Sequence, residues 1–210
     1  MPSAARRALT ALTAVVVAGG VVFASLSGAP PARRAASAAV AEHYVPIAAH
    51  APRMRSSETI ANSLLAKMNA ERRHRHLQPL RRGPLLARWA DRWARVLLVF
   101  HAFRHQNLGK IVVASDYRLE EVGENLFSGS GRGADDAGTA HLTLMRSFVH
   151  RENILLPQAQ VVGIGAVCRG NMLMVVEDFG IHSGAPLPAA GQRVLPAQPI
   201  VADKAGGPTC

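Results

Sequence analysis

The 210-residue chain has little cysteine, few acidic residues and no familiar nucleotide-binding or repeat motif. It contains two cysteines, and its 14 acidic residues are outnumbered by 24 lysines and arginines, which gives a formal net charge of +10. The glycine- and serine-rich stretch 128–133 lacks the G-x-x-x-x-G-K-[ST] spacing of a phosphate-binding loop, so we interpret it as a plain loop. No internal repeat is visible in the chain.

Hydrophobic residues are present in ordinary amount, at 49% of the chain. That share is enough for a buried core and excludes a wholly disordered chain. The length allows one domain with extensions.

The positive charge is unevenly distributed. Residues 51–105 hold 12 basic and 3 acidic residues, whereas residues 106–181 hold 6 basic and 9 acidic ones. A strongly basic half favours anionic partners such as a cell-wall polymer, in a salt-dependent way. The alternative is a solvated arginine-rich surface. We expect no specific nucleic-acid partner and a monomer.

The N-terminus is typical of an export signal. Arg6 and Arg7 precede the uncharged run 8–29, which is a positive region followed by an apolar one. Residues 1–29 are therefore predicted to be a signal peptide or, if uncleaved, an N-terminal anchor, and the protein is predicted to be secreted or tethered at the membrane surface. Residues 30–55 are rich in Ala, Pro and Arg and are predicted to be a disordered linker.

The pattern from residue 56 to residue 181 predicts one folded domain of the α+β class. Helices are expected from Ser57, from Pro84 and from Asp135 or Asp136, because capping residues precede apolar residues at helical spacing. A short strand is expected at Val122–Phe127, and a hairpin at Val161–Val167 and Met172–Phe179. The Pro-, Gly- and Ala-rich tail 182–210 is predicted to be disordered.

Two glycines in the first hairpin strand, Gly163 and Gly165, lie on one side of the strand. Glycines in a strand often mark the close approach of another element. The Trp89 and Trp93 pair, four residues apart, is predicted to belong to the core.

The two cysteines, Cys168 and Cys210, allow one disulfide. Export favours it, because disulfides persist outside the cytoplasm, and the bond would hold the tail at the edge of the sheet. The alternative is a buried thiol at Cys168 and a free terminal thiol.

Two histidines and one acid are the candidates for chemistry. Glu124 lies within Gly123-Glu124-Asn125, His105 follows Phe103, and His150 precedes Asn153 by three residues. Histidine near neutral pH serves as a metal ligand or as a general base. The alternative is that each residue is structural. His101 and His105, four residues apart, have the spacing of a helical metal pair, but we favour the interpretation that the helix ends before them.

Several short motifs in a fixed order resemble the CAP superfamily, also called SCP-like, which includes the cysteine-rich secretory, antigen 5 and pathogenesis-related proteins. They lie between residues 57 and 180, and the bacterial, secreted, cysteine-poor branch is the more similar. The motifs are Asn69-Ala70-Glu71-Arg72, Phe103-x-His105-Gln106, Gly123-Glu124-Asn125-Leu126, His150-Arg151-x-Asn153-Ile154-Leu155 and Val162-Gly163-Ile164-Gly165.

The resemblance implies an α-β-α sandwich with a small central antiparallel sheet and a cleft that holds two histidines and two acids. Carried over, the histidines are His105 and His150, and the first acid is Glu124. The position aligned with the second acid holds Ser147, and the nearest acids, Asp135 and Asp136, lie at the start of that helix. Asn125, Ser147 and Asn153 complete the predicted cleft.

The leading hypothesis is a secreted binding module. We predict that His105 and His150 bind one divalent metal, zinc above others, and that the cleft accepts a lipid-like ligand, since the resemblance permits lipid binding. One alternative is a hydrolase that uses His105, His150 and Glu124. The other is electrostatic attachment to an anionic cell-wall polymer through the basic half.

Overall fold

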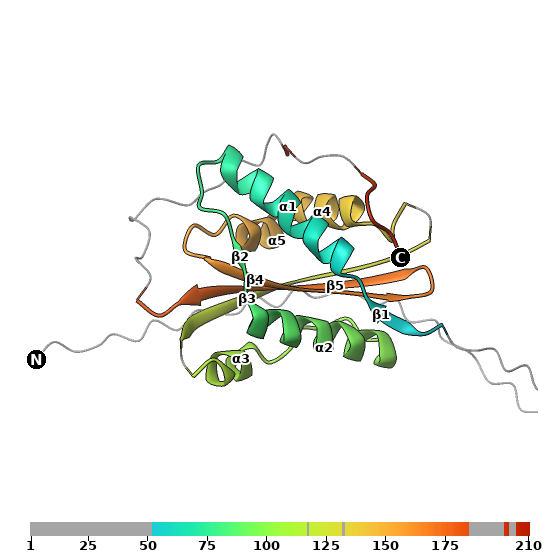
Figure 1. Ribbon diagram of the computed structural model, residues 1–210, viewed down its shortest axis with the longest axis horizontal. Coiled ribbons are helices and arrows are strands. Elements are labelled where there is room, and N and C mark those ends of the chain that lie inside the picture. Colours follow the sequence, from blue (N-terminus) through green and yellow to red (C-terminus); the bar gives the residue numbers. More distant parts are fainter. Residues whose placement is uncertain (1–51, 117, 132, 185–199, 202–204) are drawn as a thin grey trace, which may run out of the picture. The chain divides into compact units, whose positions relative to one another are not determined.

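A curled sheet lies between two layers of helices (Figure 1). The computed structural model describes residues 52–116, 118–131, 133–184, 200–201 and 205–210, which belong to one unit spanning residues 48–210. The predicted signal segment 1–29 and nearly all of the predicted linker 30–55 lie outside the described residues. In the described part of the chain, no helix combines the length and apolar character needed to cross a membrane.

The sheet has five strands, and its main path runs β1-β4-β5-β3. The central hairpin is formed by β4 and β5, and β3 pairs antiparallel with β5 along its length. Two short strands share the outer edge of β4: β1 pairs antiparallel with one end, and β2 pairs parallel with the other. The bounds are β1 Met54–Ser56, β2 Arg81–Arg82, β3 Leu119–Ser130, β4 Val161–Arg169 and β5 Met172–His182.

The helices cover both faces of this sheet. In Figure 1, α1, α4 and α5 lie on one face, and α2 and α3 lie on the other. The bounds are α1 Glu58–His74, α2 Pro84–Phe100, α3 Leu108–Ala114, α4 Ala137–Arg146 and α5 Phe148–Ile154. This arrangement confirms the predicted α+β sandwich.

The predicted helix starts have the expected caps. The Ser57 hydroxyl accepts a hydrogen bond from the Ile60 N–H, and the Asp136 carboxylate accepts one from the Thr139 N–H at 2.8 Å. Pro84 occupies the first turn of α2.

Gly163 and Gly165 allow α2 to pack directly on β4. A Cβ atom on Gly163 would lie 2.1 Å from the Leu86 carbonyl carbon, and one on Gly165 would lie 2.3 Å from that of Ala90. Because both distances are far below van der Waals contact, only glycine fits at these positions. The close approach predicted from the sequence is therefore made by the backbone of α2.

Several elements were not predicted. The segment after His105 contains α3, and His150 lies inside the short helix α5 rather than after a helix. β1 lies in what was predicted to be linker. The tail also differs from the prediction: β5 continues to His182, and Ala205–Cys210 contacts the domain.

The last residues are held at the start of α4. The Cys210 N–H donates to the Asp135 carbonyl oxygen, and Thr209 forms a β-bridge with Asp136. Cys168 and Cys210 form a disulfide with a Cα–Cα distance of 5.4 Å. The end of the chain is thereby joined to the central strand β4.

Arg72 is buried, although it lies in the last turn of α1 and arginine side chains are rarely buried. Its guanidinium donates to four carbonyl oxygens at 2.8–3.0 Å, those of Gln78, Ile154, Leu156 and Ala159. Burial lowers the Arg72 pKa to about 10. Through these bonds α1 fixes the end of α5, which carries His150.

Candidate functional site

His105 and Glu124 form the centre of the site. Glu124 lies in β3 with a completely buried side chain, whereas 60% of the His105 side chain is exposed. The His105 Nδ1 atom lies 2.6 Å from Glu124 Oε1. This hydrogen bond to the carboxylate raises the His105 pKa, because it stabilises the protonated ring. The Nε2 side of His105 is therefore directed away from the buried acid.

Gln106 connects Glu124 to a second buried acid, Asp178. The Gln106 Nε2 atom donates to Glu124 Oε2 at 2.7 Å and lies 3.1 Å from both Asp178 oxygens, and the Gln106 N–H donates to Glu124 Oε1 at 3.2 Å. Burial, followed by the charge of Glu124, raises the Asp178 pKa well above its ordinary value. The shift favours the protonated, uncharged form of Asp178.

Asp178 and Gln106 were missed from the sequence. The resemblance placed the second acid at the position of Ser147, but the acid beside Glu124 comes from β5. The signal was the pairing of the strands, since Glu124 of β3 lies opposite Asp178 of β5. Two acids in succession, Glu177 and Asp178, also interrupt an otherwise apolar strand.

A pair of asparagines joins β3 to α5. The Asn125 side chain is buried and donates to the His150 carbonyl oxygen at 3.0 Å, while its own Oδ1 accepts from Asn153 Nδ2 at 2.9 Å. Asn153 also donates to the Glu124 carbonyl oxygen at 3.3 Å. These bonds hold the backbone of His150 beside the strand that carries Glu124.

Glu177 lies behind Asn125. It is fully buried, and its Oε2 accepts from Asn125 Nδ2 at 3.1 Å. Burial raises the Glu177 pKa to about 8. At neutral pH this side chain is mostly uncharged.

His150 is oriented by Ser147, the residue between α4 and α5. The His150 Nδ1 atom lies 2.7 Å from the Ser147 hydroxyl oxygen. Burial, followed by the nearby charge of His105, lowers the His150 pKa. The hydrogen bonds of Asn125 and Asn153 place His150 beside the strand that carries Glu124, the partner of His105.

The structure thus brings together all six residues of the predicted site: His105, Glu124, Asn125, Ser147, His150 and Asn153. His101 does not join His105 on a helix, because α2 ends at Phe100 and His101 has φ 49°. Asp135 and Asp136 contact the C-terminal residues and stand apart from this network.

The donor set suits a divalent metal with few protein ligands. Each imidazole has its Nδ1 held by an oxygen, which is the outer contact typical of metal-binding histidines and leaves Nε2 for a metal. Among the residues that the structure describes, no three His, Cys, Asp or Glu side chains gather around one point. The two imidazoles are the side chains of this network that could hold a metal.

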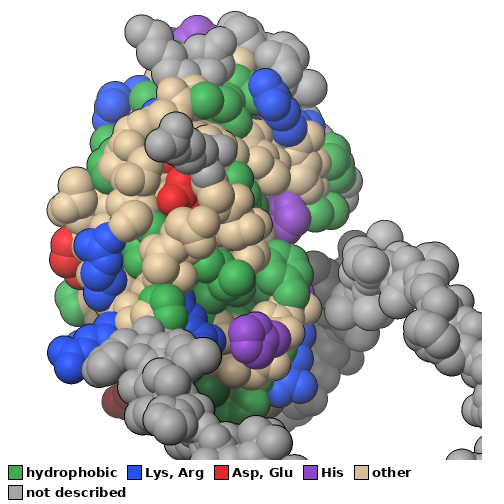
Figure 2. Space-filling view, turned by 90° about the vertical axis from the view of Figure 1, so that its right-hand side faces the viewer, with side chains coloured by type: hydrophobic (Ala, Val, Ile, Leu, Met, Phe, Trp, Pro, Cys, Tyr) green, Lys and Arg blue, Asp and Glu red, His purple; other side chains and the backbone are tan. Residues whose placement is uncertain are grey.

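Exposed apolar side chains lie next to the two histidines in the chain. Phe103 is 61% exposed, and Phe148 and Val149, beside His150, are 51% and 59% exposed. In the view of Figure 2, hydrophobic side chains gather near the middle of the surface with histidine side chains beside them.

The fold is a three-layer α-β-α domain. Its site combines a buried glutamate of β3 with two histidines from outside the sheet, and together these features indicate the class of protein. Residues 65–179 match the family described as CAP: Cysteine-rich secretory protein family. This match covers more than half of the chain, and the chain belongs to the CAP family.

Solved structures resemble this chain at low sequence identity. An outer surface protein from Borrelia burgdorferi shows the same fold, with a TM-score of 0.56 and 17% identity, and the match covers 63% of this chain and 99% of that one. An extracellular protein containing a SCP domain from Bacillus anthracis has a TM-score of 0.49 and 20% identity, with 58% and 40% covered. NaASP2, solved with Zn²⁺, has a TM-score of 0.46 and 16% identity, with 59% and 80% covered. No curated protein sequence matches this chain significantly.

Proposed function

We propose that the protein is an exported binding module in which His105 and His150 hold one divalent cation, with zinc preferred. The observation that carries the proposal is the fixed orientation of both rings: Glu124 and Ser147 each hold an Nδ1 atom, at 2.6 and 2.7 Å. Imidazole nitrogen suits zinc among the common divalent metals. Because only two protein ligands are available, affinity is modest compared with a closed four-ligand site.

Zinc titration by calorimetry tests this site. The parent and His74→Ala, which removes an exposed histidine from the end of α1, should bind one zinc ion each. His105→Ala and His150→Ala should each abolish binding. Binding should also weaken at acid pH, since a protonated imidazole cannot ligate a metal. If the double variant His105→Ala/His150→Ala binds zinc as tightly as the parent, the two histidines are structural.

The expected lipid-like ligand has a candidate position next to the site. A cavity of about 380 Å³ between α2 and α3 is lined by Trp89, Trp93 and Val96, and Gln106 forms part of its wall. The same Gln106 side chain donates to Glu124. An apolar ligand in this cavity would lie against the Gln106 side chain, and we propose that it occupies this position.

Export is supported by two features of the chain. The N-terminal pattern of Arg6 and Arg7 before an apolar run is that of a secretion signal. The Cys168–Cys210 disulfide suits an oxidising compartment. Secretion with or without cleavage is tested by N-terminal sequencing of the protein recovered outside the cells.

The hydrolase alternative gains little from Asp178. Its side chain is completely buried behind Glu124, so it cannot act directly on a bound substrate.

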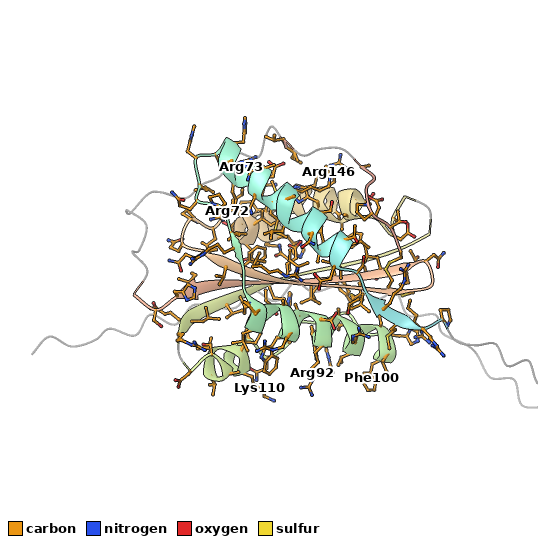
Figure 3. All side chains as sticks on the ribbon, viewed as in Figure 1. Arg72, Arg73, Arg92, Phe100, Lys110 and Arg146 are labelled. Atoms are coloured by element: carbon orange, nitrogen blue, oxygen red, sulfur yellow. A yellow bond between two sulfur atoms is a disulfide. The ribbon has the colours of Figure 1, made fainter. Side chains whose placement is uncertain are left out.

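A second candidate function is attachment to an anionic polymer by the α2–α3 layer. Arg88, Arg92 and Lys110 are exposed there, and Arg92 and Lys110 point outward on the same side of the domain (Figure 3). Binding to an anionic wall polymer should weaken steeply with added salt. Binding that is unaffected by salt would exclude this function.

A further inference from the structure

A second cavity, of about 340 Å³, lies at the opposite end of the α2–α3 layer from Phe100. It is enclosed by the start of α2, the turn between α3 and β3, the start of β4 and the end of β5. Its volume falls within the range of about 300–1,000 Å³ that is usual for small-molecule sites. None of the residues of the proposed zinc site (His105, Glu124, Asn125, Ser147, His150 and Asn153) is among its described lining residues.

The floor of this cavity is apolar and closely packed. Leu86, Leu119 and Val161 meet there over Gly180 of β5 and are all at least 90% buried. A Cβ atom on Gly180 would lie 2.9 Å from Val161 Cγ2, 3.0 Å from Leu119 Cδ2 and 3.1 Å from Leu86 Cδ1. The absence of a side chain at Gly180 therefore lets the three apolar groups converge into one continuous surface.

The rim is cationic. Arg81, Arg82, Arg118 and His182 line the cavity, and no Asp or Glu is found among its described lining residues. Arg82 already has an acidic partner, since its guanidinium forms an ion pair with Glu58 at 2.6 Å. Among the residues that the structure describes, Arg118 has one side-chain partner: its Nε donates to the Ser115 carbonyl oxygen at 2.9 Å. Its two terminal nitrogens can therefore reach a ligand.

The first turn of α2 adds to this positive character. Gly83, the N-cap residue, offers no side chain to the turn, and the N–H groups of Leu85 and Leu86 have no acceptor within the helix. The positive end of the dipole of this 17-residue helix lies at the same place. The arginines and the backbone thus favour the same sign of ligand charge.

We propose that this cavity binds an organic anion with a compact apolar body. The body would cover the Leu86, Leu119 and Val161 floor, and its carboxylate would pair with Arg81 and Arg118 at the rim. Arginine pairs with carboxylates through two parallel hydrogen bonds, which a neutral or cationic head group cannot reproduce. The apolar floor supplies affinity and the two arginines supply selectivity for charge. This site is separate from the proposed zinc site and does not depend on it.

Calorimetry with three ligands that share one ring system tests the proposal. We expect 2-naphthoate to bind the full chain with 1:1 stoichiometry. Uncharged 2-naphthamide should bind about tenfold or more weakly, since it loses the charged hydrogen bonds. Positively charged 2-naphthylmethylammonium should show no binding.

Two double variants with equal loss of charge locate the site. Arg81→Gln/Arg118→Gln should weaken 2-naphthoate binding about tenfold or more. Arg73→Gln/Arg146→Gln should leave it unchanged, because these arginines point away from the domain on the α1–α4 side (Figure 3). The unfolding midpoint of each variant shows whether it is folded.

A third variant fills the cavity without changing the charge. Leu85 is half-buried at the cavity wall, and Leu85→Trp should abolish 2-naphthoate binding while the protein still unfolds cooperatively. The proposal is overturned if 2-naphthoate fails to bind the parent, if 2-naphthamide binds equally well, or if Leu85→Trp and Arg81→Gln/Arg118→Gln both retain the parent affinity. The same variants should bind zinc with the parent affinity. A loss of 2-naphthoate binding with zinc binding retained therefore concerns this cavity and not the proposed zinc site.

Discussion

Replacing Arg72 with alanine should destabilise the whole domain, because one side chain satisfies four carbonyl groups on two segments of chain, at residue 78 and at residues 154–159. A hydrogen bond to a charged group contributes about 1.5–3 kcal/mol. Burial lowers the Arg72 pKa to about 10, which represents a desolvation cost of about 3 kcal/mol and offsets part of that gain. Some of the carbonyls regain water in the variant, so we expect a net loss of about 4 kcal/mol.

The loss of the Arg72 hydrogen bonds should also weaken zinc binding at the proposed site. Arg72 donates to the carbonyl oxygens of Ile154 and Leu156, at and just beyond the end of the helix that carries His150. Arg72→Lys keeps the charge but not the fork of donors, so it should recover only part of the lost stability. Zinc affinity in both variants should fall even where the protein remains folded.

Urea denaturation followed by tryptophan fluorescence gives the free energy of unfolding. The matched control is Arg73→Ala, the adjacent and exposed arginine, which should change stability by less than about 0.5 kcal/mol. A loss below about 1 kcal/mol for Arg72→Ala would refute the view that this guanidinium joins α1 to α5.

Two further predictions concern Glu177 and the disulfide. Between pH 4.5 and about 8, folded Glu177 keeps its proton and unfolded Glu177 loses it, so the parent should lose roughly 5 kcal/mol of stability as pH rises through this window, and Glu177→Gln should lose less. Parallel denaturation profiles for the two proteins at pH 5 and pH 9 would contradict this. Cys210→Ser should cost about 2–4 kcal/mol, since it removes a covalent link across 42 residues. Two free thiols found by labelling the parent under non-reducing, denaturing conditions would show that the bond is absent.

Periodicity and capping were enough to predict the layers of the fold. The long helices α1, α2 and α4 and the β4–β5 hairpin have strong apolar patterns and clear end signals. The missed elements are short: α3 and α5 have seven residues each, and β1 and β2 have three and two. Elements of this length depend on their neighbours for stability, and α5 exposes Phe148 and Val149, so its sequence has no buried stripe to detect.

The site was predictable only where a motif carried it. His105, Glu124 and His150 lie in motifs that the sequence displays. Gln106 lies in the same motif as His105, but its contact with Asp178 depends on the tertiary fold, and strand register places Asp178 beside Glu124. The burial of Arg72 was not predicted, because a charged side chain is rarely buried. Only its four carbonyl partners, which lie up to 87 residues away in the chain, explain its burial.

The bond between Cys168 and Cys210 makes the polypeptide a closed ring from β4 to its last residue. A protease cut anywhere between His182 and Ala205 would leave both products attached until the bond is reduced. Under non-reducing conditions such a nicked molecule would keep the mass of the intact one plus water. In a reducing compartment the same cut would release the peptide that holds the start of α4. The redox state of the surroundings would then decide whether a nick in this segment has any effect on the domain.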